Sequence, residues 1–283
     1  MKNIIYAVYA LMFAAGAVSA QEFNTDISGV IAGARDVAVS VPDLTSGVTP
    51  VDKYSQYDNS QRPATQLAGS GGTYVIQGIR GEETGDYVWD WDTMSINAGQ
   101  LDEAYWGYEG GHIGHSFLLF AFKKGGMVDQ KGRNLKGLIV SVEAWQKHGE
   151  KYRPLTLGVQ DHYPLLWDLN TWTSFADYEA TYSKRPLDIY PLHITMAQKV
   201  KMLEAAIRES VMPTHEYYNT FKNSCTNRPI GLLGEATGKD FVTLKTVPIF
   251  AVEHLKAEGL ISEGTTITES NLKTYEIRPS ERK

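Results

Sequence analysis

The sequence predicts an α+β domain in which an antiparallel sheet packs against helices. Strand-like apolar segments cluster in the middle of the chain, and amphipathic helix patterns cluster toward its C-terminal end. This separation of strands from helices is typical of α+β folds, and no internal repeat interrupts it. With 283 residues, the chain is long enough to bury one good-sized core or two small ones.

Four segments have strand patterns, and the run from His115 to Phe122 is the most apolar of them. Pro191 marks the last of the four as an edge or bulged strand. Tyr152–Val159 is a weaker fifth candidate, and the aromatic, acidic stretch 85–100 has no assignable pattern. The four strands are Thr73–Ile79, His115–Phe122, Leu138–Trp145 and Leu187–Ile194.

Three helices are expected after the strands. The clearest begins at Thr195, which forms a capping-box pattern with Gln198. Pro213 predicts that this helix ends by Met212. A second helix follows Cys225, and a third spans residues 249–258, with a glycine next in the chain as its stop.

The first 20 residues have the features of a secretory signal peptide. Lys2 gives a positive start, an apolar run follows from Ile4 to Val18, and Ser19 and Ala20 are small. The run is too short for a membrane span and ends in a cleavage pattern, so we expect cleavage after Ala20 and a periplasmic or otherwise secreted protein. No later segment reaches the roughly 18 apolar residues of a spanning helix, so no transmembrane segment is expected after cleavage.

The exported chain is expected to have an extended lead segment and one main domain. Residues 21–72 are rich in Ser, Thr, Gly, Asp and Pro and show little periodicity, whereas residues 73–283 hold the strand and helix patterns. The formal net charge is −6, and loss of Lys2 with the signal peptide makes it −7. This charge argues against nucleic acid as a partner and is a poor match to an anionic membrane surface.

The chain contains a single cysteine, Cys225, which cannot form an internal disulfide. An odd cysteine in an exported protein indicates intermolecular pairing or a thiol kept for chemistry, and the alternative is a buried, inert side chain. Pro229 belongs in the first turn of a helix, so the helix begins near Asn227, capped by Thr226 or Asn227. Cys225 then lies at a helix N-terminus, where the partial positive charge favours the nucleophilic thiolate and the backbone N–H groups of Cys225 and Thr226 can hold an oxyanion.

A cysteine nucleophile needs a base, which is usually a histidine. His115 is the preferred candidate among seven histidines, because it begins the most apolar strand directly after Gly114. His193 and His215 stay open as alternatives. A metal pair of His112 and His115 lacks further ligands, so neither a metal nor a cofactor is expected.

Glu143 and Asn223 are the candidates for a third polar group that orients the base. Glu143 follows an apolar run in its strand, although a solvent-facing position would also explain it. Tyr105, Trp106 and Tyr218 are candidates for substrate contact through their aromatic rings. The aromatic stretch 105–108, which includes Tyr105, Trp106 and Tyr108, suits an alternative function, in which the protein is a non-catalytic periplasmic module that binds cell-envelope fragments. A third interpretation is a structural envelope protein with a buried cysteine.

Three segments resemble the Lnb N-terminal periplasmic domain family. GHIGHSFLLF is similar to the G-H-[ST]-F-L element of that family, and YPLHITMAQKVKMLEAAI is similar to its strand followed by a helix. YYNTFKNSCTNRPIGLL is similar to its Tyr-Asn…Asn-Cys-Thr element and the apolar helix after it. The resemblance covers about residues 110–235, and the order and spacing of the segments make it more specific than any one motif.

The resemblance implies a fold, a site and an activity. The family takes its name from a lipoprotein N-acyltransferase, in which a cysteine and a histidine move an acyl chain from a lipoprotein lipid to an N-terminal amine. These residues would correspond to Cys225 and His115, on a permuted NlpC-type papain-like fold. In that enzyme the domain is fused to membrane helices, whereas none is expected here. Cysteine-dependent hydrolysis or transfer of an acyl or amide group on a lipoprotein or another cell-envelope substrate is therefore the expected function.

Overall fold

The structure is a computed structural model that describes residues 57, 60–83, 89–110, 114–212, 215–241, 248–275 and 277. The chain divides into two units, Met1–Ser40 and Val41–Lys283, and all described residues lie in the second. The expected signal peptide and most of the lead segment lie outside the described residues. The end of the lead segment, Thr65–Ser70, is strand β1, whose side chains are mostly exposed.

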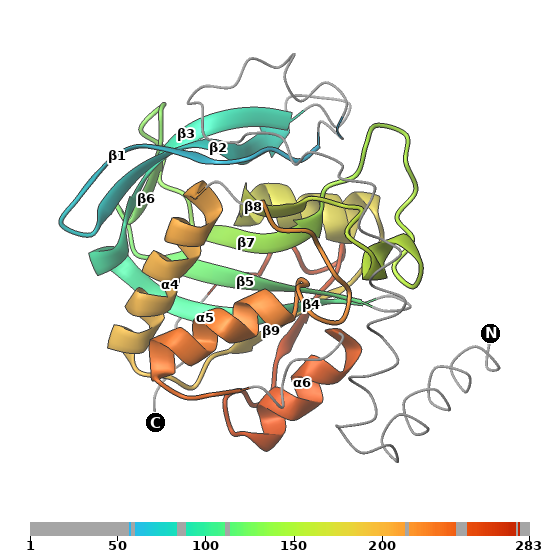
Figure 1. Cartoon of the computed structure of the whole chain (residues 1–283). Helices are drawn as coiled ribbons and strands as arrows, with labels where there is room; N and C mark the ends of the chain where they lie inside the picture. The colour runs from blue at the N-terminus through green and yellow to red at the C-terminus, as the bar shows by residue number, and fades with distance from the viewer. Residues whose placement is uncertain are drawn as a thin grey trace. The chain divides into compact units, whose positions relative to one another are not determined.

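The described residues form a mixed sheet, and the expected α+β class is confirmed (Figure 1). Its strand order is β10-β9-β4-β5-β7-β8-β2-β3-β6, with β1 paired to β2. Every pair is antiparallel except β2 with β8, which are parallel at Arg80 and Asn170. The strands after β1 are β2 (Thr73–Glu83), β3 (Trp89–Asn97), β4 (Leu101–Glu109), β5 (His115–Phe122), β6 (Met127–Asp129), β7 (Gly137–Ala144), β8 (Leu165–Thr171), β9 (Leu187–Pro191) and β10 (Thr265–Ile267).

Strand prediction was correct for β5 and close for β2, β7 and β9, but β1, β3, β4, β6, β8 and β10 were not predicted. The weaker candidate Tyr152–Val159 was wrong, because this segment forms turns and a short 3-10 helix at Leu157–Val159. Leu155 there is 54% exposed, so no sheet face buries it. Pro191 is the last residue of β9 and pairs with β4, beyond the three residues of β9 that pair with β10.

The helices begin and end where their local signals predict. Helix α4 (Met196–Val211) has Thr195 as its N-cap, with both hydrogen bonds of the capping box to Gln198, and Met212 as its C-cap. Pro229 is the third residue of α5 (Asn227–Thr237), and Thr226 precedes it as the N-cap. Helix α6 (Pro248–Ala257) follows, and α3 (Trp172–Asp177) continues into the short π-helix η4 (Tyr178–Tyr182).

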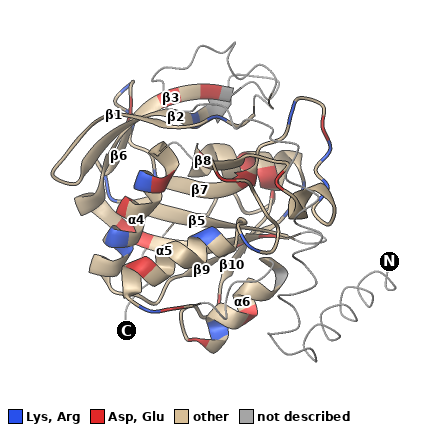
Figure 2. Cartoon of the chain, in the orientation of Figure 1, with Lys and Arg blue, Asp and Glu red and all other residues tan. Residues whose placement is uncertain are grey.

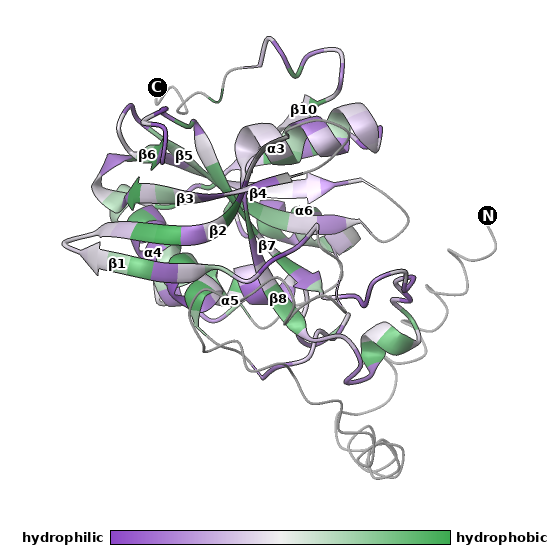
Figure 3. Cartoon of the chain, turned by 90° about the horizontal axis from the view of Figure 1, so that it is seen from above, coloured by the Kyte–Doolittle hydropathy of each residue, from purple (hydrophilic) through white to green (hydrophobic). Residues whose placement is uncertain are grey.

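The central strands are buried on both faces, which explains their continuous apolar sequence. In β5, Leu118 and Phe120 face the core shared with α4, α5 and α6, whereas Phe117 and Leu119 face the core shared with α3 and β10. Figure 1 shows α4, α5 and α6 in front of the strands, and Figure 3 shows α3 and α4 on opposite sides of them. The sheet is therefore a middle layer between two cores.

The start of β5 depends on Gly114. This residue has a φ of +77°, and a Cβ atom there would lie 2.4 Å from the ring of Tyr108. A side chain at this position would be strained and would clash with Tyr108, so glycine is required. The resulting turn brings the chain into β5 with His115 as its first residue.

Candidate thiol site

Cys225 lies immediately before the N-cap of α5, as the position of Pro229 predicts. The hydroxyl of Ser224 accepts the N–H groups of Thr226 at 3.3 Å and Asn227 at 3.4 Å, and so caps the helix. The Thr226 N–H is therefore already paired, which argues against its expected role as an oxyanion donor, whereas the same role for the Cys225 N–H stays a prediction. The hydroxyls of Thr226 and Ser116 lie 3.2 Å apart and join the start of α5 to β5.

His115 is the histidine beside the thiol. Its side chain forms a hydrogen bond with Cys225, and the next residue, Ser116, donates its backbone N–H to the sulfur. The two alternatives lie elsewhere. His193 contacts the hydroxyl of Ser262 at 3.2 Å, and His215 is exposed to solvent. The register of β5 and the docking of α5 therefore select His115.

Two groups on β7 contact the other side of the His115 ring. Nε2 of His115 lies 2.6 Å from the hydroxyl of Ser141 and 3.0 Å from Oε1 of Glu143, and the Ser141 hydroxyl donates to the same carboxylate oxygen. Residues 141 and 143 point to one face of β7 because side chains alternate along a strand. With Nε2 held in this way, Nδ1 is the ring nitrogen that faces the thiol. Glu143 therefore lies beside the preferred base, with 22% of its side chain exposed, and it lines the cavity next to the thiol.

The electrostatics of the site favour a thiolate and an imidazolium. Burial opposes charge on Cys225, but His115 and the donated hydrogen bonds outweigh it and lower the pKa of the thiol. Burial likewise lowers the pKa of His115, but Glu143 and Cys225 raise it well above its usual value. Burial raises the pKa of the Glu143 carboxyl, but His115 outweighs this effect, and the pKa of Glu143 falls to about 2. The three groups form one charged chain, and each stabilises the ionised form of its neighbour.

Tyr218 completes the surroundings of the sulfur. Its hydroxyl donates to Sγ of Cys225 at 3.5 Å, and the hydroxyl of Tyr152 hydrogen-bonds to Tyr218. The hydroxyl of Tyr152 also lies 3.4 Å from that of Thr220. Burial and the nearby thiol raise the pKa of Tyr218 well above its usual value, so this residue stays a neutral hydrogen-bond donor.

The thiol opens into a cavity of about 640 Å³. Cys225 is only 2% exposed as a residue, yet it lines this space together with His115, Glu143 and Tyr218. Much of the remaining wall is polar or charged. Its other polar residues include Arg80, Glu109, Tyr152, Asp168, Asn170, Tyr178, Glu179, Arg185 and Thr220.

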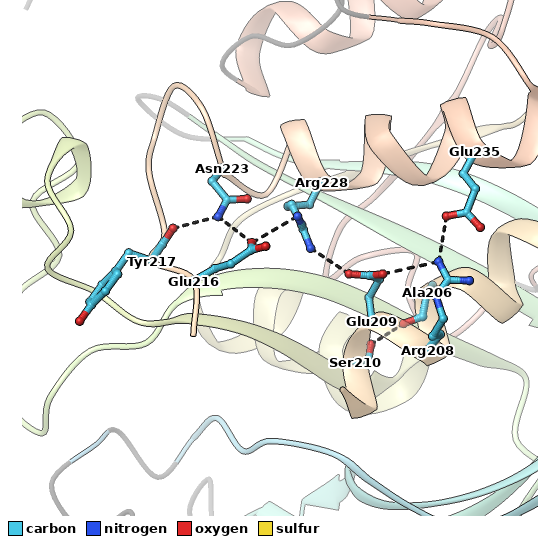
Figure 4. Close-up of polar contacts among 9 residues, drawn as sticks. All are labelled: Ala206, Arg208, Glu209, Ser210, Glu216, Tyr217, Asn223, Arg228 and Glu235. Carbon is cyan, nitrogen blue, oxygen red and sulfur yellow. Dashed lines mark hydrogen bonds and ion pairs between the residues drawn. The ribbon is translucent and has the colours of Figure 1, made fainter. Parts of the chain in front are cut away.

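Asn223 does not reach the thiol site. Its amide donates to Glu216 at 3.0 Å and to the carbonyl of Tyr217 at 2.9 Å, within a charged network that extends through Arg228 to α4 (Figure 4). Asn223 lines a separate cavity, of about 260 Å³, beside α5. The expectation that it orients the base or holds an oxyanion is therefore corrected. The reason is the turn in which the carbonyl of Asn223 accepts the N–H of Asn219.

Tyr105 and Trp106 are core residues and do not line the cavity. They are 2% and 0% exposed, on β4 between β5 and β9. Their side chains point to opposite faces of the sheet, and each face is covered by a separate core. The expectation that these rings contact a substrate is therefore corrected. Tyr218, the third expected contact, does line the cavity.

Several residues of the thiol site and its cavity could have been predicted from an alternating pattern but were not. Ser141 precedes Glu143 by two positions in β7, and Asp168 precedes Asn170 by two positions in β8. Each pair places two polar side chains on one face of an otherwise apolar strand. Glu109, Glu179 and Arg185 had no such signal, because the turn after β4 and the segment after α3 bring them together only in the folded chain.

Figure 2 shows Lys and Arg interspersed with Asp and Glu along the described helices, strands and loops. Within the described ranges, no group of three or more His, Cys, Asp or Glu side chains is placed to hold a metal ion. In the same part of the chain, no helix has the length and apolar character needed to cross a membrane.

Comparison with known proteins adds one finding. No curated protein and no solved structure matches the chain. A family model, described as the Lnb N-terminal periplasmic domain, matches residues 89–257, which include β3 to α6 and both His115 and Cys225. This match covers more than half of the 283 residues. The chain therefore belongs to the Lnb N-terminal periplasmic domain family and is periplasmic.

Proposed function

We propose that this protein is a periplasmic cysteine-dependent acyl or amide transferase or hydrolase. The observation that carries the proposal is the pairing of Cys225 with His115, which lowers the pKa of the thiol although the thiol is buried. A buried structural cysteine normally has a raised pKa and no charged partner. The Glu143 carboxylate supports the same interpretation, because it contacts the histidine as the third member of a catalytic triad does.

The proposed reaction has two steps. The Cys225 thiolate attacks a carbonyl carbon and forms a tetrahedral intermediate, and the His115 imidazolium then gives its proton to the leaving amine or alcohol. This step forms a thioester on Cys225 and breaks the original acyl bond. Water or an acceptor amine next attacks the thioester, His115 takes a proton from it, and the thiolate leaves. Hydrolysis and transfer therefore differ only in the second nucleophile.

Tyr218 is the proposed donor to the oxyanion. Its hydroxyl already points at the sulfur, so it lies within reach of an oxygen on the attacked carbon. This role replaces the one that the sequence predicted for the Thr226 N–H. We also propose the permuted papain-like fold that the family resemblance implies. The histidine strand β5, which precedes the cysteine helix α5 in the chain, supports this fold.

A lipoprotein or another cell-envelope component is the proposed substrate class, on the basis of the family. The alternative of a binding module without catalysis depended on stacking by Tyr105 and Trp106. Both rings lie in the core, so stacking by Tyr105 and Trp106 does not support that alternative.

The test is the pH dependence of Cys225 alkylation by iodoacetamide in the folded protein. We expect labelling that reaches its full rate well below pH 8.5, the usual pKa of a thiol. In His115→Ala the profile should shift upward, because the thiolate loses its cation. His162→Ala is the matched control, since His162 contacts Glu150 at 2.6 Å and does not line the cavity. Labelling that requires unfolding, or equal profiles for wild type and His115→Ala, would overturn the proposal.

A further inference from the structure

Asp168 and Asn170 form a polar pair in the cavity that the proposed reaction does not use. Both lie on β8, and Asp168 is opposite Ser141 on β7, so its side chain shares the face of the sheet that holds Ser141 and Glu143. The amide of Asn170 donates to Oδ2 of Asp168 at 2.9 Å. The pair is 3% and 1% exposed, and both residues line the cavity.

One oxygen of each residue in this pair lacks a donor. Oδ1 of Asp168 and Oδ1 of Asn170 are buried and have no hydrogen-bond partner in the structure. Buried polar atoms in proteins are almost always paired, so two neighbouring acceptors without donors mark a place for a donor that is not part of the chain. The amide orientation of Asn170 is defined by its donation to Asp168, since the reverse orientation would place two acceptors together.

The charge of the cavity identifies the kind of donor. Four carboxylates line the cavity, those of Glu109, Glu143, Asp168 and Glu179, whereas Arg80 and Arg185 are its only guanidinium groups among the described residues. Arg185 bridges Glu109 and Glu179. Glu143 contacts His115, whose charge is also shared with the Cys225 thiolate. With the thiolate counted against the imidazolium, four carboxylates therefore face two guanidinium groups, so these groups together have an excess of negative formal charge, and Arg80 is the cation that acts on Asp168.

The pKa of Asp168 shows that the chain does not fully compensate for the burial of this carboxylate. Burial raises the pKa of its carboxyl to about 7, although Arg80, the Asn170 hydrogen bond and a hydrogen bond from the backbone of Arg62 act in the opposite direction. Burial raises the pKa of Glu109 to about 7 as well. A bound cation would favour the ionised form of these groups. A bound water molecule would supply donors but would leave the charge excess unchanged.

We infer that Asp168 and Asn170 form a binding subsite for a protonated primary amine of the substrate. An ammonium group has three N–H donors and a positive charge, so it can donate to both free oxygens and offset the carboxylate. Strands β5 and β8 are separated by β7, so the subsite lies about two strand spacings, roughly 10 Å, from the strand that holds His115. The amine is thus a recognition element, distinct from the carbonyl that Cys225 attacks. This inference deepens the proposed function and rests on it.

The first experiment tests the subsite without any reaction at the thiol. Hexylammonium and the neutral 1-hexanol are titrated calorimetrically into the wild-type protein, Asp168→Asn and Asp161→Asn. Asp161 is an exposed acid that does not line the cavity, so Asp161→Asn controls for loss of one negative charge. We expect hexylammonium to bind at least about tenfold more tightly than hexanol, and Asp168→Asn alone to remove this preference. Equal binding of both probes would overturn the inference and would indicate a site for water.

The second experiment separates the subsite from the thiol chemistry. Cys225 is alkylated by chloroacetamides that have either an ω-ammonium or a methyl group at the end of alkyl chains of increasing length. We expect the ammonium series to react fastest at one intermediate length, with the advantage lost in Asp168→Asn and kept in Asp161→Asn. Rapid but equal labelling by both series would overturn the subsite and leave the proposed function intact. Slow labelling by both, with hexylammonium still bound, would overturn the proposed function and leave the subsite.

Discussion

The carboxylate of Glu143 lies 3.0 Å from Nε2 of His115, across the antiparallel pair of β7 and β5. The hydroxyl of Ser141 lies 2.6 Å from the same nitrogen. These contacts orient the ring so that its other nitrogen faces Cys225. They also stabilise the imidazolium, and the imidazolium in turn stabilises the thiolate. The reactivity of the thiol therefore depends on a carboxylate that does not touch it.

Substitution Glu143→Gln should reduce the reactivity of Cys225. Loss of this negative charge lowers the pKa of His115, and the weaker imidazolium raises the pKa of the thiol. We expect the pH midpoint of iodoacetamide labelling to rise by about one unit or more. Glu150→Gln is the matched control, because Glu150 forms the other His–Glu contact of the described residues, with His162. An unchanged midpoint in Glu143→Gln would show that Glu143 does not act on the thiol.

Substitution Tyr218→Phe should have a smaller effect in the same direction. It removes the hydroxyl that donates to Sγ but keeps the ring in place. Because a donated hydrogen bond stabilises the thiolate, the labelling midpoint should rise by up to about one pH unit. If Tyr218 also donates to the oxyanion, turnover of an activated ester should fall more than the midpoint shift explains. If turnover falls only as much as the shift of the labelling midpoint explains, Tyr218 acts on the thiol alone and not on the oxyanion.

Substitution Asn223→Ala should leave the labelling profile unchanged. The amide of Asn223 contacts Glu216 and the carbonyl of Tyr217, and it lines the separate cavity beside α5. We expect only a small loss of stability, about 1 kcal/mol, in denaturant unfolding. A large upward shift of the labelling midpoint would restore Asn223 as an orienting residue and contradict its position in the structure.

Substitution Asp168→Asn should stabilise the protein at neutral and alkaline pH. Burial raises the folded-state pKa of Asp168 to about 7, above its usual value of 3.8, so the folded state holds the proton more tightly than the unfolded state. The loss of unfolding free energy caused by the buried Asp168 carboxyl is absent below pH 4, grows as the pH rises to about 7 and is constant above pH 7. The variant should therefore gain up to a few kcal/mol at pH 8 and nothing near pH 4. Denaturant unfolding at both pH values measures the difference, and a gain that is equal at both would contradict the assignment.

Substitution Trp106→Ala should destabilise the fold. Trp106 is 0% exposed in the core between β4 and helices α4 and α5. Removal of a buried tryptophan typically costs about 3–5 kcal/mol of unfolding free energy. Chemical denaturation measures this change. A variant of unchanged stability that lost only ligand binding would instead support the contact role that the sequence predicted.

The parts of the fold that follow from local signals were predicted well. The capping box of Thr195 and Gln198 and the position of Pro229 define the starts of α4 and α5, because each acts through backbone groups within a few residues. The apolar run of β5 is likewise visible without knowledge of its neighbours. Strands β4 and β8 were not predicted, because their sequences are strands only in the context of the partners that cover them.

The sequence by itself determined which groups were available for chemistry: one cysteine at a helix start, a histidine at the head of an apolar strand and an acid on a second strand. Only the tertiary structure decided which of them meet. His115 and Cys225 are more than a hundred residues apart, and their contact depends on the docking of α5 against β5. The same long-range packing placed Trp106 in the core and Asn223 in a surface network. Side-chain chemistry is a local property of the chain, whereas proximity depends on strand order and register, which no short segment encodes.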